Sequence, residues 1–294
     1  MSGIDFVVHG PPGSAPPVMA EAFLAGVAEA GLESAAWQLV PKGDDPGVDA
    51  MNLLVTRPGD GSVLSTCTPV FLQAPLLRGM ALTHRQLTPL TRLVLDRFFV
   101  VVRADSPWTD AEKFIAGIKQ RPSRTGGYFK GGINHLLALS IAARTGADVE
   151  FVVTPSEPAV WVALIEGSID WGCGVGAEVL PHVEAGTLRV VAALDEQRIQ
   201  PFPEVATLAE AGAPVTFKLW RGLMGPPDLS AEQQSHWHSV AEAVTRTAAW
   251  QDYLRRNGQY DGFLPGEDFK DFLETEWNWY EEHLGLAGLL PEKR

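Results

Sequence analysis

The sequence has little cysteine and no excess of positive charge, and each shortage excludes a class of protein. Cys67 and Cys173 are its only cysteines, which is too few for a disulfide framework, and they lack the spacing of a metal site. Asp and Glu number 36 against 23 Lys and Arg, which gives the 294-residue chain a formal net charge of −13. An acidic chain without a basic tract is poorly suited to bind nucleic acid or anionic lipid.

Long hydrophobic runs are also missing. No segment approaches the roughly 18 apolar residues of a membrane-spanning helix, although the hydrophobic content of 46% is ordinary for a globular protein. Met1-Ser2-Gly3 leads directly into the apolar segment 4–8, without the charged and apolar regions of a signal peptide. We therefore expect either a cytosolic chain or one whose signal peptide has been replaced by a new start.

Short apolar segments alternate with helical patterns along the chain, which is typical of parallel βαβ units. Strands are expected at residues 4–8, 37–40, 63–66, 98–102, 149–153, 169–173, 188–194 and 215–223. The last part of the chain is expected to be mostly helical and to end with a helix over 267–283. The order of elements predicts an α/β protein.

This order also predicts two lobes. The first lobe is expected to hold residues 1–99 and the chain after about residue 223, with a last helix that can straddle both lobes. The second lobe is expected to hold residues 100–222. Ligands of open α/β sheets bind where strands end in loops at their carboxyl ends. The loops in question here are 11–14, 65–69, 126–134, 154–156 and 174–176.

Several motifs, in a fixed order along almost the whole chain, carry a family resemblance. They are the proline–glycine turn at 10–14, Asp60-Gly61 with the hydroxyl-rich loop 65–68, and the segments 87–90, 101–107, 180–189, 203–212 and 220–222. With these motifs the sequence resembles the extracytoplasmic substrate-binding proteins of tripartite tricarboxylate transporters, the TctC or Bug-like proteins. The resemblance implies a two-lobe periplasmic-binding-protein type II fold, with a central cleft and two hinge-crossing strands.

The resemblance also implies a function. A protein of this family captures a small organic carboxylate in the cleft, closes around it and delivers it to membrane permease subunits. It works in the periplasm as a monomer, without membrane insertion, and it uses no cofactor or metal and is not an enzyme. The alternative is a ligand-sensing regulator that uses the same cleft. The sequence leaves open whether the carboxylate is aromatic or a dicarboxylate.

By position, the family's ligand groups come from loop amides and hydroxyls of both lobes. The expected ligand-binding residues are Pro12, Gly13, Ser14, Thr66, Thr68, Tyr128, Phe129, Lys130, Gly131, Gly132, Asn134, Thr154 and Val175. Glycine loops leave amides pointing outward, and a helix N-terminus adds about half a positive charge. Such loops are able to hold an anion even in an acidic protein.

The second lobe departs from the family pattern in its ligand loops. Tyr128, Phe129 and Lys130 replace small residues, and Gly132 replaces the serine of a Gly-Ser pair. Gly174 aligns with a frequent aspartate, and Thr154-Pro155-Ser156 aligns with a Tyr-Lys-Gly stretch. We interpret these changes as a pocket for a larger or aromatic carboxylate, with Tyr128 or Phe129 stacking on it and Lys130 pairing with the anion. In the alternative, Lys130 is solvated and the aromatic rings pack under the loop.

Other chemically active residues are expected to be structural. His135 opens a helix beside the expected site, but no nucleophile and orienting carboxylate are placed near it by spacing. Cys67 and Cys173 both fall in or near ligand loops, and small free thiols are expected rather than a redox pair across the cleft.

Overall fold

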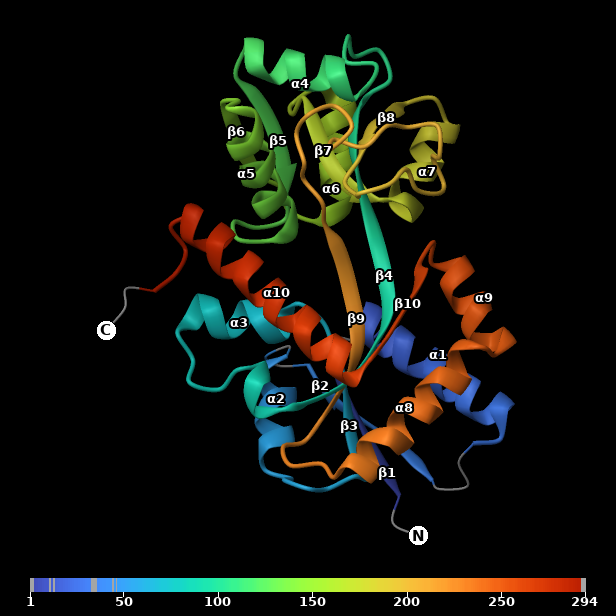
Figure 1. Cartoon of the computed structure of the whole chain (residues 1–294). Helices are drawn as coiled ribbons and strands as arrows, with labels where there is room; N and C mark the ends of the chain where they lie inside the picture. Colours follow the sequence, from blue (N-terminus) through green and yellow to red (C-terminus); the bar gives the residue numbers. More distant parts are fainter. Residues whose placement is uncertain are drawn as a thin grey trace. The chain divides into compact units, whose positions relative to one another are not determined.

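The computed structural model describes residues 3–10, 12, 14–32, 36–43, 45 and 47–291 (Figure 1). The chain divides into two compact units. Unit 1 comprises Met1–Leu95, Trp220–Glu282 and Leu290–Arg294, and unit 2 comprises Asp96–Leu219 and His283–Leu289. Among the described helices, none is both long enough and apolar enough to cross a membrane.

Unit 1 is built around a sheet with the strand order β2-β1-β3-β9-β4, and β10 pairs with β4. Its elements are β1 (Ile4–His9), α1 (Ala15–Ala30), β2 (Trp37–Lys42), α2 (Val48–Val55), β3 (Val63–Cys67), α3 (Val70–Arg78), the 3₁₀ helix η1 (His84–Gln86), β4 (Thr88–Arg103), β9 (Lys218–Gly225), α8 (Ala231–Thr245), α9 (Ala248–Arg256), β10 (Tyr260–Pro265) and α10 (Gly266–Leu286). β1 runs parallel to both β2 and β3, whereas β9 runs antiparallel to β3.

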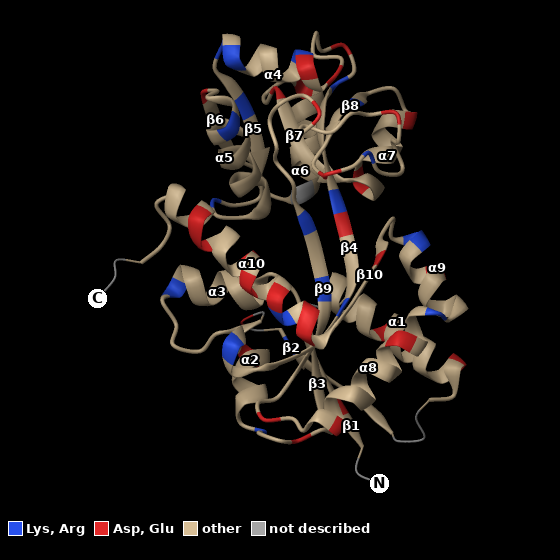
Figure 2. Cartoon of the chain, viewed as in Figure 1, with Lys and Arg blue, Asp and Glu red and all other residues tan. Residues whose placement is uncertain are grey.

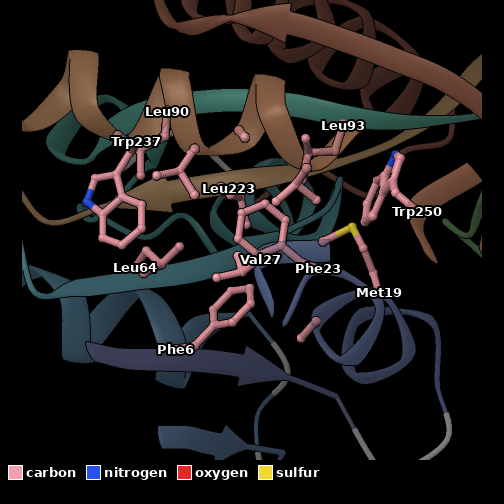
Figure 3. Close-up of a cluster of buried hydrophobic side chains, with 14 of the residues drawn as sticks. Phe6, Met19, Phe23, Val27, Leu64, Leu90, Leu93, Leu223, Trp237 and Trp250 are labelled. Carbon is pink, nitrogen blue, oxygen red and sulfur yellow. The ribbon is translucent and has the colours of Figure 1, made fainter. Parts of the chain in front are cut away.

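The core of unit 1 fixes the position of α1 against the sheet. Met19, Phe23 and Val27 recur every four residues, so they form one buried stripe on this helix. Figure 3 shows this stripe facing apolar side chains from the strands and from the later helices. Phe23 lies edge-on to Phe6 of β1, with ring centroids 5.8 Å apart. Each fully buried side chain of this size stabilises the fold by about 1.5–3 kcal/mol, so the start of α1 is held beside the end of β1.

Unit 2 has its own sheet, in which β5 lies between β6 and β7 and runs parallel to both. Its elements besides the second part of β4 are α4 (Ala111–Gln120), β5 (Ser123–Gly127), α5 (Ile133–Thr145), β6 (Val149–Val153), α6 (Glu157–Glu166), β7 (Trp171–Val175), α7 (Gly176–Glu184) and β8 (Leu188–Ala193). β7 and β8 both run antiparallel to β4. A separate core around Phe99, Trp161 and Phe202 holds this unit together.

Charged residues interrupt two strands that are otherwise apolar. Arg92, Asp96 and Arg97 lie in β4, and Lys218 and Arg221 lie in β9. Figure 2 shows blue and red bands on β4 and β9. Buried charged side chains are rare without partners, so each of these positions needs a structural or functional reason.

Candidate functional site

Three neighbouring strands of unit 1 bring polar side chains to the same end of the sheet, where β1 and β3 finish. This end is called the edge below. The carboxyl ends of β1 and β3 meet there because the two strands are parallel. β9 is antiparallel to β3, with Cys67 opposite Gly222. His9 is the last residue of β1, Thr68 directly follows β3, and Arg221 precedes Gly222 in β9. These three residues therefore reach the same edge of the sheet.

His9 connects the two threonines of the expected ligand loop. Its Nδ1 lies 2.9 Å from the Thr66 hydroxyl and 3.1 Å from the Thr66 carbonyl oxygen. Its Nε2 lies 3.0 Å from the Thr68 hydroxyl. His9 and Thr66 are buried, whereas Thr68 is half-buried. The histidine is thus a buried support behind a half-buried threonine.

The tautomer of His9 decides what Thr68 offers to a ligand. With the proton on Nδ1, His9 donates to the Thr66 carbonyl and the Thr68 hydroxyl must donate to Nε2. With the proton on Nε2, the Thr66 hydroxyl donates to Nδ1, and His9 donates to the oxygen of Thr68. Only in this second arrangement does Thr68 keep its proton for an anion.

The charge state of His9 is fixed by its surroundings. Burial lowers the pKa of His9 from 6.5 to about 4, the hydrogen bond to the Thr66 backbone opposes this change, and the positive charge of Arg221 adds to it. The imidazole is therefore neutral at pH 7. Arg221 is itself only 7% exposed, so a buried cation faces the edge that carries the threonines.

The described residues at the start of α1 provide few amide donors at this edge. Ser14 is the N-cap of α1, Pro16 and Pro17 lie in the first turn, and the first helical bond runs from the amide of Val18 to the carbonyl of Ser14. Proline has no N–H, so this helix N-terminus lacks two of its donors. Pro12 is exposed, and the predicted ligand residue Gly13 lies outside the described residues.

Two amides of the glycine loop of unit 2 already donate hydrogen bonds to acceptors nearby in sequence. The amide of Gly131 donates to Nδ1 of His135 at 2.9 Å. The amide of Gly132 donates to the carbonyl of Phe129 at 3.2 Å. An anion at this loop would therefore meet amides that already have acceptors. His135 acts as the anchor of the loop, and its ring also packs on Phe151 with centroids 4.5 Å apart.

Lys130 affects His135 electrostatically. The pKa of His135 is lowered, first by burial and then by the positive charge of Lys130. The lysine itself is exposed.

The aromatic residues of this loop present about half of their surface to solvent. Tyr128 is 51% exposed and Phe129 48%, and their rings meet edge-to-face with centroids 5.7 Å apart. A Cβ added to Gly132 would lie 3.1 Å from the Phe129 ring. The ring of Phe129 thus occupies the space beside Gly132 where the family has a serine side chain.

The indole ring of Trp161 explains why residue 174, at the end of β7, is a glycine. A Cβ at this position would collide with the indole ring of Trp161. Trp161 is 6% exposed and belongs to the core of unit 2, so it cannot easily move aside. The aspartate that family members often have here cannot fit without repacking of the indole.

The remaining expected ligand residues of unit 2 have defined local roles. Thr154 is buried, and its hydroxyl donates to the carbonyl of Ser156 at 3.0 Å. Val175 is the N-cap of α7 and is half-buried. Asn134 lies in the first turn of α5 and is half-buried. Thr154 directly follows β6 and Val175 is the last residue of β7, whereas Asn134 lies within α5. The expected loop 126–134 is therefore shorter, because Gly126 and Gly127 belong to β5, a strand that was not expected from the sequence.

The two cysteines are unsuited to nucleophilic chemistry. Both are free and buried, and burial raises the pKa of each thiol far above its ordinary range. The thiolate is the reactive form of cysteine, so neither residue is activated. Within the described part of the chain, no group of three or more His, Cys, Asp or Glu is placed to hold a metal ion.

Sequence reasoning missed His9 and Arg221. A usable signal was present for Arg221, because it is the single charged residue in the apolar segment 219–225. His9 ends an apolar strand immediately before the proline–glycine turn, at the position from which parallel strands contribute to sites. Its partners are more than 50 residues away in sequence, so only the fold could reveal them.

A pocket of unit 2 lies away from these loops. It is lined by Arg103, Trp108, Arg121 and Asp170, among others, at the end of the sheet where β5 and β7 begin. Arg121 and Asp170 form an ion pair of 2.9 Å across it. Its charges are thus paired with each other, and it has no link to the expected ligand loops.

Comparison with known proteins gives a consistent result. The family model described as "Tripartite tricarboxylate transporter family receptor" matches residues 43–276. A UPF0065 protein of Bordetella pertussis is 19% identical over 248 residues, which cover 83% of this chain and 77% of that protein. The protein BugT of the same organism is 34% identical over 119 residues, which cover 39% of this chain and 36% of BugT.

Solved structures agree along nearly the whole chain. A TctC solute-binding protein from Polaromonas, without ligand, has a TM-score of 0.86 at 24% identity, covering 97% of this chain and 98% of its own. An R. palustris protein with adipate has a TM-score of 0.77 at 21% identity, covering 99% of both chains. MatC from Rhodopseudomonas palustris, with bound malate, has a TM-score of 0.69 at 17% identity, covering 97% of this chain and 99% of MatC. The predicted periplasmic-binding-protein type II fold is confirmed.

Proposed function

Since the chain belongs to the tripartite tricarboxylate transporter family of receptors, we propose that it binds a small organic carboxylate for delivery to a membrane permease. The family resemblance drawn from the sequence motifs is confirmed. Two solved proteins of the same fold carry adipate and malate, which supports a carboxylate as the ligand here. In this proposal the protein works outside the cytoplasm and leaves its ligand chemically unchanged.

The proposal rests on the hydroxyl groups of Thr66 and Thr68, which both contact His9. A carboxylate only accepts hydrogen bonds, so it needs donors at the edge of the sheet. With the proton of His9 on Nε2, a chain of donors runs from Thr66 through His9 to Thr68, and the Thr68 hydroxyl ends it. A bound carboxylate favours this tautomer because it gives the anion a donor.

The loop 128–132 of unit 2 carries groups that suit an organic anion. Tyr128 and Phe129 offer exposed aromatic surface, and Lys130 adds an exposed cation next to them. Aromatic pairs contribute about 0.5–1.5 kcal/mol beyond area burial. We therefore retain an aromatic carboxylate as the preferred ligand class, with a dicarboxylate as the second option.

The proposal is tested by replacing Thr68 with valine, which has nearly the same shape but no hydroxyl. A hydrogen bond to a charged group contributes about 1.5–3 kcal/mol, so binding of the best carboxylate should weaken roughly 10- to 100-fold. Thr56→Val is the matched control, because Thr56 is exposed and its hydroxyl donates to the carbonyl of Leu53. Equal affinities of both variants and the parent in calorimetric titration would remove Thr68 from the site.

A further inference from the structure

We propose that the guanidinium of Arg221 pairs directly with a carboxylate of the ligand and restricts the protein to anionic ligands. This inference rests on the proposed function and adds a residue that sequence motifs did not assign. It makes the main anchor a side-chain cation of unit 1, rather than the backbone amides of the glycine loops.

The position of Arg221 supports this role. Because Cys67 lies opposite Gly222, the next pair along the antiparallel register is residue 68 with residue 221. Arg221 therefore lies beside Thr68, the half-buried residue whose hydroxyl faces the same edge. The side chain is 7% exposed, so the guanidinium lies in a region where water screens its charge weakly.

The positive charge of Arg221 acts on a group at this edge. Arg221 contributes to the lowered pKa of His9, and His9 is hydrogen-bonded to both threonines. An anion held by Thr68 would therefore enter the same positive potential. A guanidinium has five N–H donors in a planar fork that matches a carboxylate, so it is able to serve a partner within the protein and a ligand together.

The described residues at the N-terminus of α1 offer few backbone donors, which favours such a cation. Pro16 and Pro17 remove two amides from the N-terminus of α1. A chain of net charge −13 also repels an anion at long range. A bidentate pair with Arg221 would supply two N–H···O bonds, as many as the two prolines remove.

Arg92 shows what a purely structural arginine looks like in the same unit. It is half-buried in β4, its Nε donates to the carbonyl of Gly262 at 2.8 Å, and its guanidinium lies 4.5 Å from the centre of the Phe272 ring. Arg92→Gln is therefore the control for losing an arginine of this unit whose side chain is engaged by Gly262 and Phe272.

The test compares full-length Arg221→Gln, Arg221→Lys and Arg92→Gln with the parent by calorimetric titration. The probes are adipate, malate and benzoate, with adipamide and benzamide as neutral counterparts. We expect Arg221→Gln to weaken the best carboxylate about 100-fold and Arg221→Lys about 10-fold, because lysine keeps the charge but loses the fork. Arg92→Gln should stay within about threefold of the parent, and the parent should not bind the amides.

Each outcome has a defined meaning. Parent-like carboxylate affinity of Arg221→Gln overturns the inference and leaves the proposed function standing. If Arg221→Gln does not unfold cooperatively, Arg221→Lys decides, and parent-like affinity of that variant overturns the inference. A parent that binds none of the three carboxylates contradicts the proposed function, and the inference falls with it.

Discussion

His9 holds the hydroxyl of Thr68 at 3.0 Å through Nε2, although the two residues are 59 positions apart in sequence. The contact exists because β1 and β3 are parallel neighbours that end at one edge. It links a buried, neutral imidazole to a half-buried threonine. The capacity of Thr68 to donate thus depends on a residue that no ligand needs to touch.

The state of His9 predicts a pH dependence of stability. The pKa of His9 is about 4 in the folded protein and 6.5 in its ordinary range, so the unfolded chain binds a proton first as the pH falls. The contribution of His9 is therefore complete above about pH 6.5 and is lost progressively toward pH 4. Over this window the parent should lose about 3 kcal/mol of unfolding free energy through this residue.

Urea unfolding of the parent and of His9→Gln, at steps from pH 7.5 to pH 4, isolates this contribution. Other titrating groups act equally in both proteins, so the difference between the two curves belongs to residue 9. We expect the gap in unfolding free energy to shrink as the pH falls. A gap that stays constant over this range would mean that His9 is not held in its neutral form.

Lys130 gives a second prediction that does not require a known ligand. Its charge is the smaller of the two causes that lower the pKa of His135, after burial. Lys130→Ala should therefore raise the pKa of His135 partway toward its ordinary value. NMR titration of the histidine ring signals measures this directly, and Lys130→Arg, which keeps the charge, is the control. An unchanged His135 pKa in Lys130→Ala would place the lysine away from the loop anchor.

Gly132 and Phe129 should behave as a coupled pair. Restoring the family serine by Gly132→Ser puts a Cβ about as close to the Phe129 ring as real contacts allow, 3.1 Å. The ring is half exposed and is able to shift, so we expect a loss of stability of about 1 kcal/mol or less. In a Phe129→Ala background the same change should cost almost nothing. Additive effects in this double-mutant cycle would contradict the contact.

The sequence predicts the fold class well because hydrophobic periodicity is a local signal. The last helix was expected over 267–283 and runs over Gly266–Leu286. β4 was expected only over 98–102 but spans Thr88–Arg103. Its first half contains Pro89, Thr91 and Arg92, which break the apolar run, and the strand exists there because β10 pairs with it. That partner, β10, was not expected at all.

Turn chemistry was predicted more reliably than the element around it. In the sequence, Thr207-x-x-Glu210 predicts a capping box on a short helix that Gly212 ends. The structure has the reciprocal bonds of this box between the two residues, at 2.7 and 3.0 Å. The segment they begin remains a series of turns instead of a helix, because Gly212, at a φ of 86°, ends it within one turn.

From the sequence, only the loops that contribute to the candidate site are predictable. The βαβ order predicts which loops lie at the carboxyl ends of strands, and the family resemblance singles out Thr66 and Thr68 within one of these loops. The role of Arg221 depends on the antiparallel entry of β9, and the role of His9 depends on its neighbour β3. Both relations join residues far apart in sequence, and no local pattern encodes them.

The central claim is that the protein binds a carboxylate, and thermal unfolding against a ligand panel tests it most directly. The panel comprises aliphatic and aromatic mono-, di- and tricarboxylates, with their neutral amides, amino acids and sugars. A ligand at 100 times its dissociation constant stabilises a protein by about 2.7 kcal/mol, a shift of roughly 2–10 °C. The account predicts such a shift with one class of carboxylate and none with its amides. A shift produced only by neutral or cationic compounds would contradict it.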